Sequence, residues 1–348
     1  MEFMRNLNLI LAFQLLLHVS CKKESVTEHV VEPIPVVVAA PLRTITVATV
    51  IELKTALAGA KAGDEIVLKD GVYKGNFVIP ATANGTAINK ITLKGSRNAV
   101  LDGDRITTGY VLHLQASHWH IKGISITNGL KGLMTDGASF NTIDSIRVFN
   151  TGEEAIHLRR FSSHNIIRKV SVEQTGLKTP DYGEGIYIGS AKNNWETYTN
   201  GAFDMCDSNL VEQCKIGPAI SAECIDVKEG TTGGVIRNNT FNATGITGAN
   251  SADSWIDVKG NYYLIENNTG INPSGSMLKD GYQVNVAYSG WGNYNEFKGN
   301  ICYVNASGYG FLIRLSSSNG TATGNKVYTN NIVNGAASGV SNIPLSNN

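Results

Sequence analysis

Short runs in which every second residue is apolar recur along the chain from about residue 120 onward. In a first series the early runs repeat every 22 or 23 residues, and insertions stretch the later spacing. Its members are 120–126, 141–148, 165–172, 209–214, 234–239, 263–268 and 294–300. Apolar alternation of period two is typical of strands, and a repeat of this length is typical of a stacked solenoid.

A second series of shorter apolar runs falls between the members of the first. Its members are 155–158, 185–188, 224–227, 255–258, 283–286 and 310–313. Helical repeats would need a period of 3.6, and leucine-rich repeats would need a regular leucine frame; the chain has neither. The pattern predicts an all-β fold, a right-handed single-stranded parallel β-helix. Alternate Ile, Val and Leu would face inward, and the recurrent Asn residues would form stacked amide ladders at the bends.

The open N-terminal end of such a solenoid must be covered. Residues 47–60 have helical spacing, with Val50, Leu53 and Leu57 on one side, and strand-like residues 63–68 follow. We therefore expect a short capping helix that leads into the first strands.

The largest insertion lies between Ile188 and Asn209 and contains Trp195, Tyr198 and Phe203. Two interpretations stay open. These aromatic rings either overhang a groove and stack on sugar rings, or they pack on the solenoid wall.

The composition supports this fold class. Charged residues make up 17% of the chain, which has 37 Gly and 8 Pro and a formal net charge of zero. These values argue against disorder, a coiled coil and collagen, and they give no support to a broad nucleic-acid-binding face. We expect a monomer with no nucleic-acid partner.

The N-terminus indicates export. Arg5 precedes an apolar run, 9–19, that is too short to span a membrane and ends at Ser20-Cys21, so residues 1–21 resemble a signal peptide with a lipobox-like end. Cys21 would then carry a lipid, the only expected membrane attachment; the alternative is ordinary secretion. We predict an outer-membrane or cell-surface lipoprotein, or a periplasmic or secreted protein.

Two further segments complete the predicted organisation. Residues 22–43, with three prolines, would be an exported tether, and residues 44–348 would be the β-helix catalytic domain. Four cysteines lie in that domain at positions 206, 214, 224 and 302. Their spacing matches no zinc motif, so either a structural disulfide or plain buried thiols is expected.

Aligning the second series predicts which side chains share a row across neighbouring coils, about 4.8 Å apart. One inward row contains Ile156, Ile186, Ile225, Ile256, Val284 and Phe311. The outward row one residue later contains His157, Tyr187, Asp226, Asp257 and Asn285. The outward row three residues later contains Arg159, Gly189, Lys228, Lys259, Ala287 and Arg314. In a chain this poor in charge, such rows indicate a polar functional surface.

A row of acids, Glu154, Glu184 and Glu223, lies two residues before the inward row. Three carboxylates at one-coil spacing repel one another unless something neutralises them. A hard cation with oxygen ligands would do so, and in an exported protein calcium is the first expectation. The alternative is that some of these side chains turn to solvent or pair with a nearby Arg or Lys.

The segment 222–228, followed by Arg237-Asn-Asn-Thr-Phe241, resembles the catalytic coil of the chondroitinase B and alginate lyase family of β-helix lyases. In that family a calcium-binding Glu lies five residues before the catalytic Lys, which is the spacing from Glu223 to Lys228. The family's second basic residue is an Arg on the next coil, and the matching position here is Lys259.

A second resemblance is to the β-helix pectate lyases that use a lysine base. It rests on 119–124 with 141–143, while 70–74 and 91–95 are similar to both families. The general resemblance covers about residues 45–330, whereas the catalytic match is confined to two coils.

The resemblance to these lyases implies β-elimination on a uronate polysaccharide. Calcium held by Glu184 and Glu223, with Asp226, would neutralise the uronate carboxylate, and Lys228 would remove the C5 proton. This role requires a lowered lysine pKa, which neighbouring cations and the metal would supply.

Further roles follow from the same resemblance. Lys259 or Arg159 would stabilise the enolate or assist the leaving oxygen, and His157 and Tyr187 are candidates for the acid or for substrate contact. The expected substrate-binding residues are Tyr187, Arg314, Asp257 and Trp195.

Two other functions remain open at this point. Asp226 and Asp257 lie one coil apart and could serve a glycoside hydrolase, or an epimerase, on the same fold. A non-catalytic glycan-binding β-helix is the third possibility. Pectate, alginate and glycosaminoglycans all offer a carboxylate and a C5 proton, so the sequence leaves the substrate open within the acidic polysaccharides.

Overall fold

The computed structural model describes residues 40–273 and 276–347. The predicted signal peptide, the lipidation site Cys21 and nearly all of the tether fall outside these residues and stay predictions. None of the described helices is long and apolar enough to cross a membrane.

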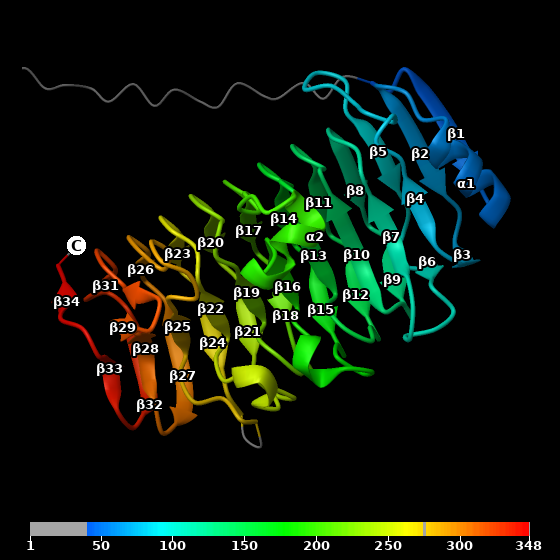
Figure 1. Ribbon diagram of the computed structural model, residues 1–348. Helices are drawn as coiled ribbons and strands as arrows, with labels where there is room; N and C mark the ends of the chain where they lie inside the picture. Colours follow the sequence, from blue (N-terminus) through cyan, green and yellow to red (C-terminus); the bar gives the residue numbers. More distant parts are fainter. Residues whose placement is uncertain (1–39, 274–275, 348) are drawn as a thin grey trace, which may run out of the picture. The chain divides into compact units, whose positions relative to one another are not determined.

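The described chain winds through three parallel sheets, and each coil contributes a strand to the first, the third and then the second sheet (Figure 1). The first sheet contains β1 (Arg43–Val47), β2 (Asp64–Leu68), β5 (Ile91–Lys94), β8 (Trp119–Lys122), β11 (Thr142–Asp144), β14 (Ile166–Arg168), β17 (Leu210–Glu212), β20 (Val235–Arg237), β23 (Leu264–Glu266), β26 (Glu296–Lys298), β31 (Lys326–Tyr328) and β34 (Leu345–Ser346). This arrangement confirms the predicted right-handed parallel β-helix.

The second sheet carries the candidate site. It contains β4 (Phe77–Ile79), β7 (Tyr110–Leu114), β10 (Lys131–Asp136), β13 (Ile156–Arg159), β16 (Ile186–Ile188), β19 (Ile225–Val227), β22 (Ile256–Val258), β25 (Tyr282–Val284), β28 (Tyr309–Ile313) and β33 (Gly339–Ser341).

The third sheet contains β3 (Gly71–Lys74), β6 (Ala99–Asp102), β9 (Ser125–Thr127), β12 (Arg147–Phe149), β15 (Ser171–Glu173), β18 (Lys215–Ile216), β21 (Thr240–Asn242), β24 (Thr269–Ile271), β27 (Ile301–Ala306) and β32 (Ile332–Ala336). A small hairpin, β29 (Ser316–Ser317) and β30 (Gly320–Thr321), stands apart from the three sheets.

The long runs of the first series are two strands each, which corrects the sequence interpretation. The run 120–126 contains β8 and β9, separated by Gly123 at φ +81°, and the run 141–148 contains β11 and β12, separated by Ser145 at φ +55°. A left-handed residue turns the chain sharply without interrupting the apolar alternation, so the two strands look continuous in sequence.

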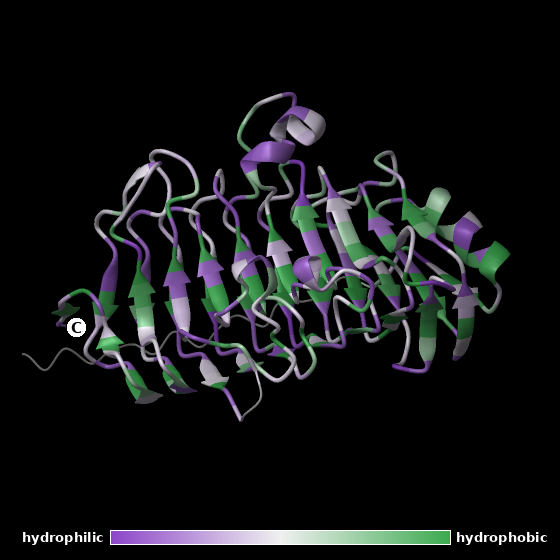
Figure 2. Cartoon of the chain, turned by 60° about the horizontal axis from the view of Figure 1, so that its bottom comes forward, coloured by the Kyte–Doolittle hydropathy of each residue, from purple (hydrophilic) through white to green (hydrophobic). Residues whose placement is uncertain are grey.

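Apolar residues fill the interior of the coils, and Figure 2 shows apolar and polar residues alternating along the strands. Inward side chains such as Ile121, Ile167 and Ile236 are fully buried. The predicted amide ladders are also present: the Asn239 side-chain oxygen accepts from the backbone N–H of Cys214, and Asn268 does the same for Asn239. These bonds satisfy backbone groups at the bends, where strand pairing stops.

The N-terminal end is covered by α1 (Val50–Ala58), within the predicted helical segment. Thr49 and Glu52 form a capping box, and Leu53 and Leu57 are buried against the first coil. The remaining short helices, all in loops, are η1 (Pro180–Tyr182), η2 (Lys192–Asn194), α2 (Trp195–Thr199) and η3 (Ala249–Ser251).

The four domain cysteines are buried free thiols, so of the two sequence interpretations the structure supports the second. Cys214 illustrates their environment, because burial raises the pKa of its thiol to about 12.

Candidate active site

The predicted outward residues of the second sheet form three rows on its outer face. The carboxylate row is Glu154, Glu184 and Glu223. The middle row is His157, Tyr187, Asp226, Asp257 and Gln283. The basic row is Arg159, Gly189, Lys228, Lys259, Asn285 and Arg314.

The predicted register is wrong by two residues in one coil. Ile256 pairs with Tyr282 rather than with Val284, so Gln283 takes the place in the middle row that was assigned to Asn285. Asn285 moves to the basic row in place of Ala287. The alignment failed because a Tyr, and not an aliphatic residue, occupies the inward position of this coil.

A cleft of about 300 Å³ lies over the central coils of these rows. Its lining residues are Glu184, Glu223, Asp226, Lys228, Asn250, Ser251, Asp257, Lys259, Gln283, Asn285 and Arg314. A larger, mostly apolar hollow of about 500 Å³ lies between β1 and α1, and none of the predicted site residues line it. The smaller cleft is therefore the candidate site.

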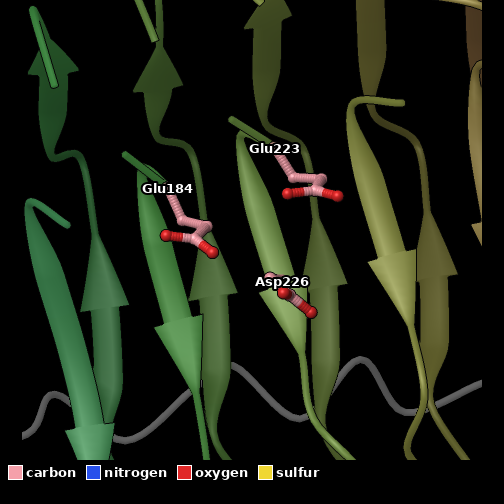
Figure 3. Close-up of side chains that lie close together, drawn as sticks. All are labelled: Glu184, Glu223 and Asp226. Atoms are coloured by element: carbon pink, nitrogen blue, oxygen red, sulfur yellow. The ribbon is translucent and has the colours of Figure 1, made fainter. Parts of the chain in front are cut away.

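Three carboxylates converge in this cleft. Glu184, Glu223 and Asp226 each offer an oxygen, and these atoms lie within 4.8 Å of one another (Figure 3). Glu184 Oε2 is buried and has no hydrogen-bond partner within the described residues. Burial, then the charges of Glu154 and Asp226, raise the pKa of Glu184 to about 8. A buried acidic trio with an unpartnered oxygen fits a hard cation with oxygen ligands.

Glu154 stands apart from this trio, although it belongs to the same row. Its carboxylate pairs with the Lys131 ammonium and lies 3.3 Å from His157 Nδ1. Burial favours the neutral acid, but the His157 hydrogen bond and the Lys131 charge outweigh it and hold the pKa of Glu154 at about 2. Glu154 therefore matches the alternative in which a carboxylate of this row pairs with a nearby lysine.

Lys228 and Lys259 share the carboxylate of Asp226. Lys228 Nζ lies 2.5 Å from Asp226 Oδ2, and Lys259 Nζ lies 2.8 Å from Asp226 Oδ1 and 2.6 Å from Asp257 Oδ2. Burial lowers the pKa of Lys228, yet the charges of Asp226 and Glu184 outweigh it and raise that pKa. The protein's own side chains therefore raise the pKa of Lys228, whereas the sequence predicted that neighbouring cations and a metal would lower it.

Tyr187 lies beside the lysines. Its ring centroid is 4.7 Å from Lys228 Nζ and 4.4 Å from the centroid of the His157 ring. Burial first, then the charges of Asp226 and Glu184, raise the pKa of its phenol well above the usual value. Tyr187 thus keeps its proton at neutral pH, next to the amine of Lys228.

His157 and Arg159, both on β13, are each held by partners of their own. His157 Nε2 lies 2.9 Å from the Gly189 carbonyl oxygen. Arg159 forms a two-pronged ion pair with Asp136, and the Tyr198 ring stacks 3.9 Å from its guanidinium. Gly189 occupies the basic row between Arg159 and Lys228, so these two row positions lie two coils, about 10 Å, apart.

Trp195 is buried in the insertion that carries it. The indole N–H donates to the Ser190 carbonyl at 2.9 Å, and its ring packs against Phe203 and Tyr288 at centroid distances of 5.0 and 5.3 Å. Of the two interpretations of this insertion, Trp195 agrees with the one in which its aromatic rings pack on the protein rather than stack on sugars. Its ring has no free face for a sugar.

Several residues of the site were not identified from the sequence. Asn250 and Ser251, at positive φ, line the cleft from a loop that carries no strand signal. Lys131 and Asp136 belong to β10, one coil before the first run of the second series. The short apolar pair Leu133-Met134, one coil length before Ile156, could have revealed this coil and, with it, the partners of Glu154 and Arg159.

Comparisons with known proteins agree with the fold. Residues 43–209 match the family model described as Pel9A-like, right handed beta helix region. The crystal structure of alginate lyase from Paenibacillus sp. str. FPU-7 is 40% identical, with a TM-score of 0.81, and the match covers 87% of this chain and 99% of that one.

More distant relatives share the fold. Pectate lyase L from Thermoclostridium stercorarium is 24% identical over 291 residues, which are 74% of this chain and 22% of that protein. The chain thus spans about a fifth of that curated relative. The pectate lyase Pel9A structure is 14% identical, with a TM-score of 0.57 over 84% of this chain and 78% of that one, and shows the fold alone. The 40% identity over almost the whole Paenibacillus enzyme shows that this chain belongs to the same family of right-handed β-helix polysaccharide lyases.

Proposed function

We propose that this lyase cleaves alginate by β-elimination, with Lys228 as the general base. The observation that carries the proposal is the pair Lys228 and Lys259 beside a buried carboxylate trio in one cleft, in a chain 40% identical to an alginate lyase. Lys228 would take the C5 proton, the C4–O bond would break, and a double bond would form between C4 and C5.

The trio supports a calcium ion at Glu184, Glu223 and Asp226. When bound, such an ion supplies positive charge that offsets the three carboxylates. Asp226 and Glu184 are the groups that raise the pKa of Lys228, so the same residues control how readily this amine gives up its proton.

Two further side chains have roles in this proposal. Lys259, held between Asp226 and Asp257, keeps a fixed positive charge facing the cleft and would stabilise the enolate. Tyr187 retains its proton beside Lys228 and would donate it to the leaving oxygen. His157 is less suited to this role, because its Nε2 is hydrogen-bonded to the Gly189 carbonyl and its Nδ1 faces the Glu154 carboxylate at 3.3 Å.

The geometry argues against a hydrolase. A glycoside hydrolase needs two carboxyl groups free to act on the scissile bond. Here Asp226 is bridged by both lysines, and Asp257 is engaged by Lys259 and the amide of Asn285. Pectate is the second candidate substrate, favoured by the curated pectate lyase relative.

The test is ultraviolet absorbance during incubation with alginate, pectate, chondroitin, dermatan and hyaluronan. We expect absorbance from the new double bond with alginate, its loss in Lys228→Ala and its reduction by a chelator. Lys326→Ala, at an exposed position in the first sheet, is the control and should retain activity. Absorbance that survives in Lys228→Ala would exclude this base, and absorbance with pectate alone would move the substrate to the second candidate.

A further inference from the structure

Arg314 differs from the other cations of the basic row. Arg159 pairs with Asp136, and both lysines pair with Asp226. Among the described residues, no carboxylate oxygen lies within 4.0 Å of the Arg314 guanidinium, and its only side-chain hydrogen bond is to Gln283 Oε1, at 3.3 Å. Arg314 is exposed and lines the same cleft as the lysines. Its charge is therefore available to a ligand.

The side chain of Gln283 is buried and held in one orientation. Its Nε2 donates to Asp253 Oδ1 at 2.6 Å and to Asp280 Oδ2 at 3.0 Å. Because ionised carboxylates only accept hydrogen bonds, they fix the NH₂ group on their side of the amide. The amide oxygen must then face Arg314 and Asn285, as observed.

This arrangement orients Arg314 without neutralising it. A glutamate at position 283 would offer a similar oxygen but would form an ion pair with the guanidinium. A neutral acceptor leaves the planar fork free to bind a carboxylate through two parallel hydrogen bonds. The ligand that matches Arg314 is thus a carboxylate.

The position of Arg314 along the solenoid identifies which carboxylate it would bind. Arg314 follows β28, three coils beyond Lys228, which at about 4.8 Å per coil is about 14 Å. One coil is close in length to one pyranose of a 1,4-linked polyuronate. A chain lying along the basic row would therefore present a second uronate carboxylate to Arg314 while another reacts at Lys228.

We propose that Gln283 is a positioning residue that orients Arg314, without neutralising its charge, for the carboxylate of a second uronate, three coils from the reacting one. The inference rests on the proposed function and deepens it. The recognised substrate is a polyanion whose carboxylates recur along the solenoid axis, and short oligosaccharides do not reach Arg314.

The test uses a size series of uronate oligosaccharides and compares Arg314→Ala and Gln283→Glu with the native chain. For oligosaccharides long enough to reach Arg314, both variants should raise KM about tenfold, the effect of one charge-assisted hydrogen bond, with kcat nearly unchanged. For the shortest cleaved oligosaccharide, both should match the native chain. Added to Arg314→Ala, Gln283→Glu should have little further effect.

Further variants separate this role from a structural one. Arg314→Lys keeps the charge and should restore part of the affinity for long oligosaccharides. Gln283→Met removes the acceptor without adding a carboxylate beside Asp253 and Asp280, and should raise KM by a smaller factor. Gln213→Glu makes the same charge change at an exposed bend and should leave KM unaltered.

Two results would overturn the proposal: an equal rise in KM for every length, or additive effects of Gln283→Glu and Arg314→Ala. Calorimetric binding of the same oligosaccharides in the Lys228→Ala background separates this failure from failure of the proposed reaction, because binding needs no turnover. Length-dependent binding that Arg314→Ala abolishes would support the subsite even if no polymer is cleaved. Binding that Arg314→Ala leaves unchanged would exclude it.

Discussion

Charged side chains follow the outer face of the second sheet along most of its length, but two parts of that face use them differently. Over β7 to β13 the charges are paired: Lys131 with Glu154, and Arg159 with Asp136. Over β16 and β19, Glu184 and Glu223 have no Lys, Arg or His within ion-pair distance among the described residues. Paired buried charges are compatible with a purely structural role, whereas unbalanced ones indicate a site for a ligand.

The contrast is sharpest between two glutamates on adjacent coils. Glu154 and Glu184 occupy the same row and are both buried, yet the pKa of Glu154 is held at about 2 and that of Glu184 is raised to about 8. His157 and Lys131 supply the difference, because both lie against Glu154 and no Lys, Arg or His lies within ion-pair distance of Glu184 among the described residues. These two partners separate a structural acid from a candidate ligand.

The largest expected effects come from replacing two lysines of the second sheet, Lys228 and Lys131. Lys228→Ala should lower the elimination rate by about 10²- to 10⁴-fold, the usual contribution of a general base, with a smaller cost in stability because Asp226 keeps Lys259. Lys131→Ala should instead lower the free energy of unfolding by about 3–5 kcal/mol, because Glu154 loses its buried partner. Absorbance assays and denaturant unfolding measure the two quantities.

The control is the activity of Lys131→Ala measured well below its unfolding midpoint. If this variant loses kcat as severely as Lys228→Ala, the division between a structural and a functional part of the sheet is wrong.

The fold was accessible from sequence because period-two alternation and bend asparagines repeat in every coil. The Glu184, Glu223 and Asp226 trio followed from the same alignment, since side chains at equivalent positions of stacked strands must lie together. The third strand of each coil was missed because a single left-handed residue, such as Ser145, turns the chain without leaving a gap in the pattern.

The remaining differences between prediction and structure arise from side-chain interactions that an alignment of strands cannot predict. The pairing of Glu154 depends on Lys131, which lies in a coil outside the aligned runs. The sign of the Lys228 pKa shift depends on whether its nearest neighbours are carboxylates or cations, and a row of like charges suggested cations. The contacts of Asp226 show that carboxylates from the adjacent row dominate.

A second prediction tests the paired part by pH. Burial favours the neutral acid at Asp136, but hydrogen bonds from His113 and Arg159 and the guanidinium charge outweigh it and hold the pKa of this carboxyl well below its usual range. A lowered folded-state pKa stabilises the fold above the unfolded-state pKa of about 4, and this contribution is lost as pH falls further.

Asp136→Asn should therefore cost about 3 kcal/mol of unfolding free energy at pH 7 and progressively less below about pH 4. Denaturant unfolding of both chains across this range gives the difference directly. A difference that stays constant down to pH 3 would contradict the assignment of the stabilisation to the ionised carboxyl.

A third prediction tests the unbalanced part with metal alone. Calcium at 100 times its dissociation constant should add about 2.7 kcal/mol to the stability and raise the melting temperature relative to chelator. Glu223→Gln should abolish this increase, while Glu154→Gln, one row neighbour away but outside the trio, should retain it despite a lower starting stability. Equal calcium responses of the two variants would contradict a site made by the trio.

The smallest effect concerns Arg159, which sequence resemblance placed beside the reacting sugar. The structure surrounds its guanidinium with Asp136 and Tyr198 and separates it from Lys228 by the bare position of Gly189. Because Lys keeps the charge but loses the two-pronged pairing, Arg159→Lys should reduce stability while changing kcat by less than about threefold, under 1 kcal/mol. A loss of kcat comparable to that of Lys228→Ala, in a protein that remains folded, would return Arg159 to the reaction and extend the catalytic part of the sheet across β13.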